Sequence, residues 1–313
     1  MKRAAILETP AGEGLAACRL RLPHTHPYDW PAMLRFLAAR AIPGVERVAD
    51  GAYARTIALH GAVGTVEVRA APPHLLATIR FPDEAALPAI GARLRRLLDL
   101  DADAAAIAGA LGADPLLAPL LAARPGLRVP GAWDGFELAV RAILGQQVSV
   151  AAASTLAGRL AARFGTPLAG GAEGEGLATI FPAPAALAGA DIAAIGLPRA
   201  RAAALAALAS AAASDPALLG GDGTPTATIA RLRELPGIGE WTAQYVAMRA
   251  LRDADAFPTS DLGLLRAVAA LTGAARPSPA ELLARAEAWR PWRAYAALHL
   301  WMSDAAPAER RTA

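Results

Sequence analysis

Segments with the alternating pattern of β-strands are confined to one short part of this chain. Three runs have this pattern: 53–60, 63–70 and 75–81. Gly61 and the Pro72-Pro73 pair separate these runs, as expected of turns between neighbouring strands. Helical patterns lie on both sides, from Trp30 onward and over 87–100. The first part of the chain therefore predicts a small α+β domain over 25–110, in which helices cover one face of an antiparallel sheet.

After Asp101 the pattern is helical, interrupted by Gly and Pro. The expected helices are 103–111, 115–122, 134–145, 149–164, 184–189, 191–195, 198–213, 226–234, 240–251, 262–272, 279–288 and 291–303. The glycine-rich segment 170–176 predicts a surface loop, and residues 1–24 predict an irregular N-terminal tail. The predicted fold class is α+β, with an antiparallel-sheet domain followed by an all-α part.

Cysteine and lysine are almost absent from this sequence. Cys18 is the single cysteine, which excludes an intramolecular disulfide and a Cys₄ zinc or iron–sulfur site. His24 and His26 are compatible with a weak surface metal site and with an ordinary solvated linker. Lys2 is the only lysine, so nearly all positive charge is arginine, although the net charge of +3 does not by itself indicate nucleic-acid binding.

The sequence has no long uninterrupted apolar stretch. It therefore predicts no membrane span and no signal peptide, and we expect a cytoplasmic protein.

The segment 233–248, RELPGIGEWTAQYVAM, predicts a tight hairpin between two helices. One helix ends near Glu234, the turn is Pro236-Gly237-Ile238-Gly239, and the next helix begins near Glu240. Such a hairpin presents backbone N–H groups at a helix N-terminus, where a DNA phosphate can bind regardless of base sequence. An ordinary turn between helices is the alternative.

Aromatic and acidic side chains follow the hairpin. Trp241 and Tyr245 are four residues apart and share a helix face. Asp261 stands where the helix 262–272 begins, so an N-cap is its simplest role. Thr259 or Ser260 could cap that helix instead, which would free Asp261 for chemistry.

Together these residues resemble the helix-hairpin-helix DNA glycosylase superfamily, and within it the DNA-3-methyladenine glycosylases II of the AlkA type. The resemblance extends through 28–46, 123–150 and 289–301 and covers 25–303. It implies that two helical domains enclose an active-site cleft. By this resemblance the residues 136–253 form the domain with the hairpin, and 111–135 and 254–313 form the domain that carries the catalytic aspartate.

The resemblance implies a monofunctional DNA glycosylase of base excision repair. Such an enzyme hydrolyses the N-glycosidic bond of alkylated bases, such as 3-methyladenine and 7-methylguanine, after flipping them out of duplex DNA. Asp261 would stabilise the positive charge that develops on the sugar. Trp241, Tyr245 and Trp301 would hold the cationic base between aromatic faces, although Trp301 fits an apolar helical stripe equally well. Double-stranded DNA is the expected partner, and we expect a monomer.

Lyase activity requires a lysine that is missing here. Bifunctional relatives place this lysine in the helix after the hairpin, where it forms a Schiff base with the sugar. The corresponding residue in this chain is Trp241, and Lys2 is the only lysine. We therefore expect hydrolysis that leaves an abasic site.

The resemblance also assigns residues to the DNA backbone and to an ion. Pro236, Gly237, Ile238, Gly239 and Thr242 would contact phosphate. The backbone carbonyls of Leu235 and Ile238 would hold a structural monovalent cation, and no other cofactor is expected.

Gln146 and Gln147 match a loop that enters the minor groove in this superfamily. Some relatives have a bulky apolar wedge at the second position, where this chain has Gln147, and helix capping explains both glutamines equally well. Arg199 and Arg201 are compatible with phosphate contacts and with surface solvation.

Two other functions are compatible with the sequence. A non-catalytic damaged-DNA-binding module would keep the hairpin, but it would have no need of Asp261. A helical scaffold protein whose hairpin is only a turn would bind duplex DNA with almost no salt dependence.

Overall fold

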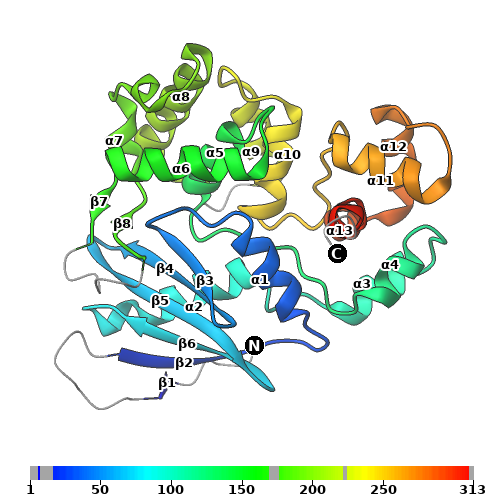
Figure 1. The fold of residues 1–313 in the computed structure, drawn as a ribbon, viewed down its shortest axis with the longest axis horizontal. Helices are drawn as coiled ribbons and strands as arrows, with labels where there is room; N and C mark the ends of the chain where they lie inside the picture. Colours follow the sequence, from blue (N-terminus) through cyan, green and yellow to red (C-terminus); the bar gives the residue numbers. More distant parts are fainter. Residues whose placement is uncertain (1–5, 8–16, 169–175, 221–223, 310–313) are drawn as a thin grey trace.

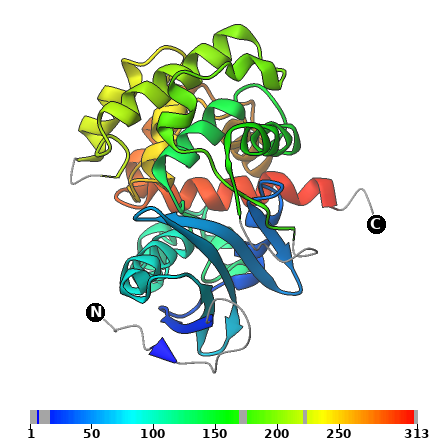
Figure 2. The ribbon, with the colours of Figure 1, turned by 90° about the vertical axis from the view of Figure 1, so that its left-hand side faces the viewer.

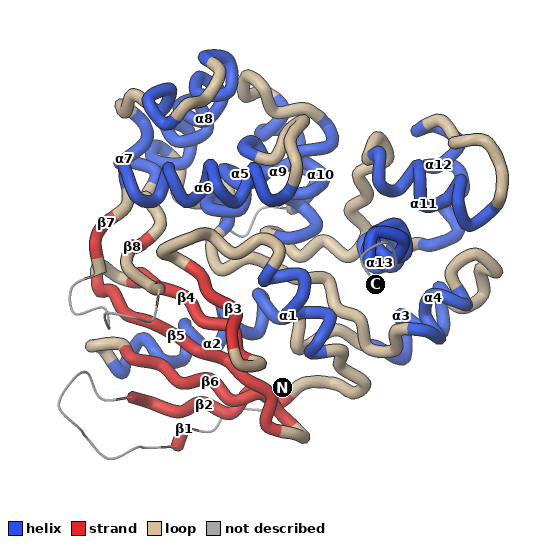
Figure 3. Tube along the Cα trace, viewed as in Figure 1, coloured by secondary structure: helices blue, strands red, loops and turns tan. Residues whose placement is uncertain are grey.

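The computed structural model describes residues 6–7, 17–168, 176–220 and 224–309 (Figure 1). An antiparallel sheet with its helices occupies one side of the molecule, and two groups of helices occupy the rest (Figure 3). The predicted fold class, α+β followed by a helical part, is confirmed. Most of the predicted loop 170–176 lies outside the described residues.

The main sheet has the strand order β1-β2-β6-β5-β4-β3, and every neighbouring pair is antiparallel. Its strands are β1 (Ile6–Leu7), β2 (Ala17–Pro23), β3 (Glu46–Ala49), β4 (Ala52–Leu59), β5 (Ala62–Ala71) and β6 (His74–Arg80). Two helices, α1 (Trp30–Ala38) and α2 (Leu87–Leu98), contribute Met33, Leu37 and Leu94 to the core that also buries Tyr53 and Val68 from the sheet. One face of the sheet is thereby covered, as the alternating pattern predicts.

The prediction of an irregular tail over 1–24 is wrong where the structure describes these residues. Strand β2 pairs along its whole length with β6, from Ala17 opposite Arg80 to Pro23 opposite His74. Its sequence has the period of two that a half-buried strand requires, because buried Leu20 and Leu22 alternate with exposed arginines. The short strand β3 was also not predicted, and its four residues are too few for a clear pattern.

The helical part is not free of strands either. Two-residue strands β7 (Thr166–Pro167) and β8 (Thr179–Ile180) pair with each other. The Thr56 hydroxyl of β4 donates a hydrogen bond to the Thr179 carbonyl at 2.8 Å, which ties this ribbon to the main sheet. Strands this short carry no periodic signal in the sequence.

The remaining elements are helical. They are η1 (Glu84–Ala86), α3 (Ala104–Leu111), α4 (Ala118–Ala123), α5 (Gly135–Leu144), α6 (Val150–Phe164), α7 (Pro184–Ala188), η2 (Ile192–Ile195), α8 (Arg199–Ser214), α9 (Pro225–Arg233), α10 (Glu240–Arg249), α11 (Leu262–Thr272), α12 (Pro279–Ala286), η3 (Glu287–Trp289) and α13 (Arg293–Glu309). No helix in the described part of the chain is long and apolar enough to cross a membrane.

The helices pack around two hydrophobic cores. One core joins α5, α6, α8 and α10, and the other joins α3, α11, α12 and α13. Chain segments far apart in sequence meet in the second core, where Ile107 and Leu111 pack with Leu264, Leu282 and Trp289. Seen from the side, α13 crosses the middle of the molecule (Figure 2).

Candidate active site

The hairpin between α9 and α10 requires glycine at one position. Gly237 has φ +78°, and a Cβ there would lie 2.7 Å from the Ala204 Cβ of α8. Gly239 is the N-cap of α10, where a Cβ would meet no atom within 4 Å. No side chain caps α10, so the first N–H groups of this helix remain available to a ligand.

Gln146 braces the hairpin from the end of α5. Its Nε2 donates hydrogen bonds to the Gly237 carbonyl at 2.9 Å and to the Thr242 Oγ1 at 3.0 Å. Arg201 in turn donates to the Gln146 carbonyl at 2.8 Å. Thr242 is only 2% exposed, so its side chain stabilises the hairpin and is not accessible to DNA. Gln147 is exposed and has φ +56°.

A cleft of about 1020 Å³ opens beside the hairpin. The residues that the sequence assigns to base binding and catalysis meet there, although they come from three helices. Trp241 and Tyr245 belong to α10, Asp261 precedes α11, and Trp301 belongs to α13. Gln147 lies at the same cleft.

Asp261 is the N-cap of α11 and also the centre of a hydrogen-bond network. Its Oδ1 accepts hydrogen bonds from the Leu264 backbone N–H at 3.0 Å and from the Trp301 indole at 2.9 Å. Its Oδ2 accepts a hydrogen bond from the Trp241 indole at 2.8 Å. The cap therefore comes from Asp261 itself and not from Thr259 or Ser260. Capping uses one oxygen and leaves the carboxylate in the cleft.

Three aromatic side chains of the cleft, Trp241, Tyr245 and Trp301, form a chain of ring contacts. The rings of Trp241 and Tyr245 are stacked, with centroids 5.2 Å apart and an interplanar angle of 10°. The rings of Tyr245 and Trp301 meet edge to face at 6.3 Å. Trp301 also packs against the core of α11 to α13, so lining the cleft and packing the helices are both roles of this residue.

The cleft also contains residues that the sequence did not point to. Phe36 and Arg40 reach it from α1 and the turn that follows, Arg141 from α5 and Arg249 from α10. The first two belong to the segment 28–46, which carries part of the family resemblance, but only the fold brings them to the hairpin. Arg249 is 5% exposed, and no spacing in the sequence distinguishes it from a surface arginine.

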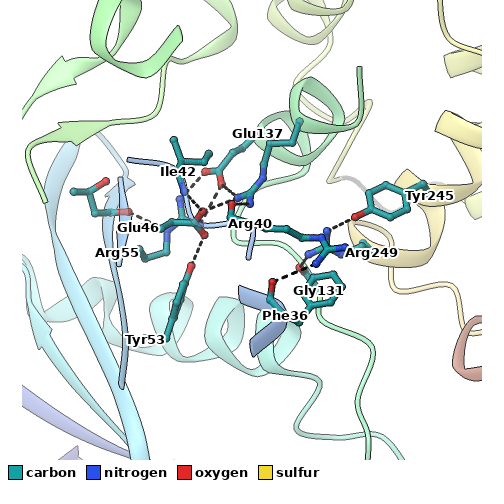
Figure 4. Close-up of polar contacts among 12 residues, drawn as sticks. Phe36, Arg40, Ile42, Glu46, Tyr53, Arg55, Gly131, Glu137, Tyr245 and Arg249 are labelled. Atoms are coloured by element: carbon teal, nitrogen blue, oxygen red, sulfur yellow. Dashed lines mark hydrogen bonds and ion pairs between the residues drawn. The ribbon is translucent and has the colours of Figure 1, made fainter. Parts of the chain in front are cut away.

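Arg249 connects the cleft to the segment before α5 (Figure 4). Its Nη1 donates a hydrogen bond to the Tyr245 Oη at 2.6 Å. Its Nε and Nη2 donate to the carbonyls of Pro130 and Gly131 at 2.7 and 3.0 Å. All three bonds come from one planar guanidinium group, which fixes the phenol relative to the backbone.

A buried ion network joins the sheet to α5 below the cleft (Figure 4). The Arg55 Nη2 of β4 lies 2.6 Å from the Glu137 Oε2 of α5, and the Arg141 Nη1 lies 2.8 Å from the Glu46 Oε2 of β3. Tyr53 donates to Glu46 at 2.7 Å. Burial acts to raise the pKa of Glu46, but the nearby Arg141 and Arg55 outweigh it and hold this pKa below its ordinary value.

The described part of the chain contains no group of three or more His, Cys, Asp or Glu side chains that could hold a metal ion. His24 and His26 lie with ring centroids 4.6 Å apart, outside the cleft.

Two family models match the chain. The AlkA N-terminal domain matches residues 19–134, and the HhH-GPD superfamily base excision DNA repair protein matches residues 140–293.

Curated relatives are similar over most of the chain. The DNA-3-methyladenine glycosylase 2 of Escherichia coli is 40% identical over 285 residues, which are 89% of this chain and 95% of that protein. The probable bifunctional transcriptional activator/DNA repair enzyme AlkA of Mycobacterium tuberculosis is 42% identical over 300 residues, or 96% of this chain. The chain spans only 60% of the length of this mycobacterial relative.

Among solved structures, a 3-methyladenine DNA-glycosylase from Archaeoglobus fulgidus superimposes with a TM-score of 0.79. The two sequences are 25% identical, and the match covers 91% of this chain and 97% of the other.

Proposed function

Since this chain belongs to the family of the DNA-3-methyladenine glycosylases 2, within the HhH-GPD superfamily of base excision DNA repair proteins, we propose that it excises alkylated bases from duplex DNA. The proposed reaction is hydrolysis of the N-glycosidic bond of a base that has been flipped into the cleft. The observation that carries this proposal is the placement of Asp261 in the cleft beside Trp241, Tyr245 and Trp301.

Asp261 is the proposed catalytic residue. Three N–H groups donate to its two oxygens, which suits an ionised carboxylate because that group accepts and does not donate. Cleavage of the glycosidic bond develops positive charge on the sugar. A carboxylate held in place before the reaction stabilises this charge without reorganising during the step.

Trp241, Tyr245 and Trp301 are the proposed base pocket. Alkylated purines such as 3-methyladenine and 7-methylguanine are cationic, and aromatic faces attract cations. Such a base is already a good leaving group, so the reaction needs no strong general acid.

The hairpin is the proposed site of DNA backbone binding. The uncapped start of α10 offers N–H groups to a phosphate, and Pro236, Gly237 and Gly239 beside it are exposed. Ile238 is 5% exposed and anchors the turn in the core. Exposed Gln147 at the cleft is the proposed residue that enters the duplex, and its neighbour Gln146 is held in place by its hydrogen bond to the hairpin. We propose that one protein molecule suffices for this binding.

A monovalent cation at the hairpin is a further part of the proposal. Hard cations bind oxygen ligands, and backbone carbonyls are among them. The Leu235 carbonyl accepts one hydrogen bond, from the Ile238 N–H at 3.2 Å, and a carbonyl has a second lone pair. The carbonyls of Leu235 and Ile238 would hold the ion and stiffen the turn.

Hydrolysis without lyase activity is the proposed outcome. The helix after the hairpin has Trp241 where lyases carry their lysine, and Lys2 is the only lysine of the chain. The product would be an intact strand with an abasic site.

The test is base release from methylated duplex DNA by the wild type and by Asp261→Asn. We expect the substitution to lower the rate by at least about 10²-fold, as the loss of a preorganised electrostatic group does in other enzymes. Asp103→Asn is the matched control, since Asp103 also caps a helix, α3, but lies outside the cleft. Strand breaks should appear only after alkali treatment.

Other outcomes would overturn the proposal. Tight, salt-sensitive binding of damaged DNA without base release by the wild type would establish a damage-binding module. Binding without salt dependence would mean that the hairpin is only a turn.

A further inference from the structure

We propose that the Tyr245 side chain is an anionic phenolate in the cleft and that its charge selects cationic over neutral bases. This inference rests on the proposed function, because it concerns the base that the cleft accepts. Its starting point is the charge balance of the buried groups below the cleft.

Two arginines of this region lack a carboxylate partner. Arg55 and Arg141 pair with Glu46 and Glu137, which balances these four charges. Arg249 is buried, yet it forms no ion pair with any described carboxylate, and the same is true of half-buried Arg40. Buried charges are normally paired, so the region lacks negative charge.

Tyr245 lies where this negative charge is missing. Its Oη accepts the 2.6 Å hydrogen bond from Arg249, a distance at or below the usual range for a charged donor and a charged acceptor. The Arg249 guanidinium also lies over the Tyr245 ring, 5.3 Å from its centroid. A phenolate oxygen would neutralise part of the excess charge.

The charged groups around Tyr245 act in opposite directions. Burial acts to raise its pKa, but the guanidinium groups of Arg249, Arg40 and Arg141 outweigh burial and leave the pKa below the ordinary value. From the other side of the cleft, Asp261 opposes ionisation, while Arg266 and Asp304 form an ion pair with each other.

The other three tyrosines have the opposite environment. Tyr28, Tyr53 and Tyr295 each donate a hydrogen bond, to the Leu98 carbonyl, Glu46 and Asp99 respectively. Burial, together with the neighbouring carboxylates, raises the pKa of each of them. Tyr245 is therefore distinct among the four tyrosines of the chain.

A phenolate at this position acts on binding more than on bond cleavage. Its ring stacks on Trp241 and faces the cleft, so its charge attracts a cationic base that enters. A neutral base gains only stacking. The cationic base leaves as a neutral molecule, so the attraction stabilises the bound substrate at least as much as the transition state.

The ionisation can be measured on the free protein, without DNA. Tyrosinate absorbs at longer near-ultraviolet wavelengths than tyrosine, so a pH titration of the absorption difference between wild type and Tyr245→Phe isolates this residue. We expect the wild type to contain one tyrosinate already at about pH 7.5, the pH of the binding measurement below, where an ordinary tyrosine is protonated. It should disappear in Tyr245→Phe, persist in the control Tyr295→Phe and shift to higher pH in Arg40→Gln. A wild type without tyrosinate at about pH 7.5, or an unchanged titration in Tyr245→Phe, would overturn the inference.

The selectivity is tested by binding. In the Asp261→Asn protein the damaged base should remain attached, so the Kd for duplexes with 7-methylguanine and with neutral hypoxanthine can be compared. Adding Tyr245→Phe should weaken binding of the cationic lesion about tenfold and that of the neutral lesion less than twofold. Equal weakening for both lesions would overturn the inference. Failure of the wild type to release any base would instead refute the proposed function, and the titration would still decide the ionisation.

Discussion

The two indole N–H groups of the cleft each donate to a different oxygen of Asp261. The tryptophans therefore orient the carboxylate in addition to lining the pocket. A substitution by phenylalanine can separate these two roles. Phenylalanine keeps an aromatic ring in the cleft but has no N–H group to donate to Asp261.

Trp241→Phe tests the contribution of one such hydrogen bond. A hydrogen bond to a charged group contributes about 1.5–3 kcal/mol, so we expect base release under single-turnover conditions to slow by about tenfold or more. Trp292→Phe is the control, since Trp292 packs on Tyr295 outside the cleft. Equal rates in the two variants would show that Trp241 does not orient the carboxylate.

The burial of His299 in α13 predicts that the protein loses stability in acid. Burial, followed by the charge of Arg124, lowers the pKa of His299 to about 4. An unfolded histidine takes up a proton near pH 6.5, so stability is present above that pH and falls as the pH drops toward 4. Because of this residue, we expect the free energy of unfolding to be about 2 kcal/mol lower at pH 5 than at pH 7.

Urea unfolding at these two pH values measures the effect. In His299→Gln the difference between pH 7 and pH 5 should shrink by that amount. In Ser303→Ala, which changes another side chain of α13 but no titratable group, the difference should stay as in the wild type. The prediction is wrong if His299→Gln keeps the full acid sensitivity.

At the scale of elements, periodic patterns predicted most of the fold. The strands β4, β5 and β6 and the helices of the second part have enough residues for a period of two or of 3.6 to be recognised. Strand β2 has such a period too, but it follows a stretch of sequence with Pro10, Gly12 and Gly14, which concealed the period. Strands β3, β7 and β8 are too short to show any period.

The backbone conformation of the hairpin depends on one glycine of its sequence, Gly237. Gly237 lies in the left-handed region, so an L side chain there costs about 1–2 kcal/mol in backbone strain. The added Cβ would also lie 2.7 Å from the Ala204 Cβ of α8. Gly237→Ala should therefore weaken binding to undamaged duplex DNA severalfold, because the turn must shift away from α8. Fluorescence anisotropy measures this binding.

Gly239→Ser is the matched control for the free protein. It changes the other glycine of the same turn, at a position with open space and with the conformation of an ordinary N-cap. Its unfolding midpoint should stay near that of the wild type, whereas the midpoint of Gly237→Ala should fall. Equal midpoints would mean that the close approach to Ala204 is not strained.

At the scale of the whole molecule, the candidate site depends on contacts that no local pattern contains. The sequence indicated Trp241, Tyr245 and Asp261, which lie within 21 residues of one another. It gave no sign that Phe36 and Arg40, about 200 residues earlier, belong to the same cleft. Chain segments this distant meet only through tertiary packing, and a single sequence does not encode that packing in any spacing.

The ion network below the cleft joins the sheet to the helical part. Its charge balance predicts how much stability the protein loses when one carboxylate is removed. Glu137 and Arg55 are 5% and 2% exposed at their side chains. Glu137→Gln would leave Arg55 and Arg141 to share Glu46, and an uncompensated buried charge costs about 3–5 kcal/mol. The control Glu67→Gln removes a half-buried carboxylate at the surface and should cost less than about 1 kcal/mol.

A double variant separates the charge from the loss of contacts. Arg55→Met together with Glu137→Gln removes one charge of each sign and leaves the pair of Glu46 and Arg141 intact. If the unbalanced charge causes the loss, this double variant should be more stable than Glu137→Gln alone, although it has lost more hydrogen bonds. Denaturant unfolding of the three proteins gives the comparison. A double variant less stable than the single one would show that the hydrogen bonds, and not the charge balance, hold the sheet to α5.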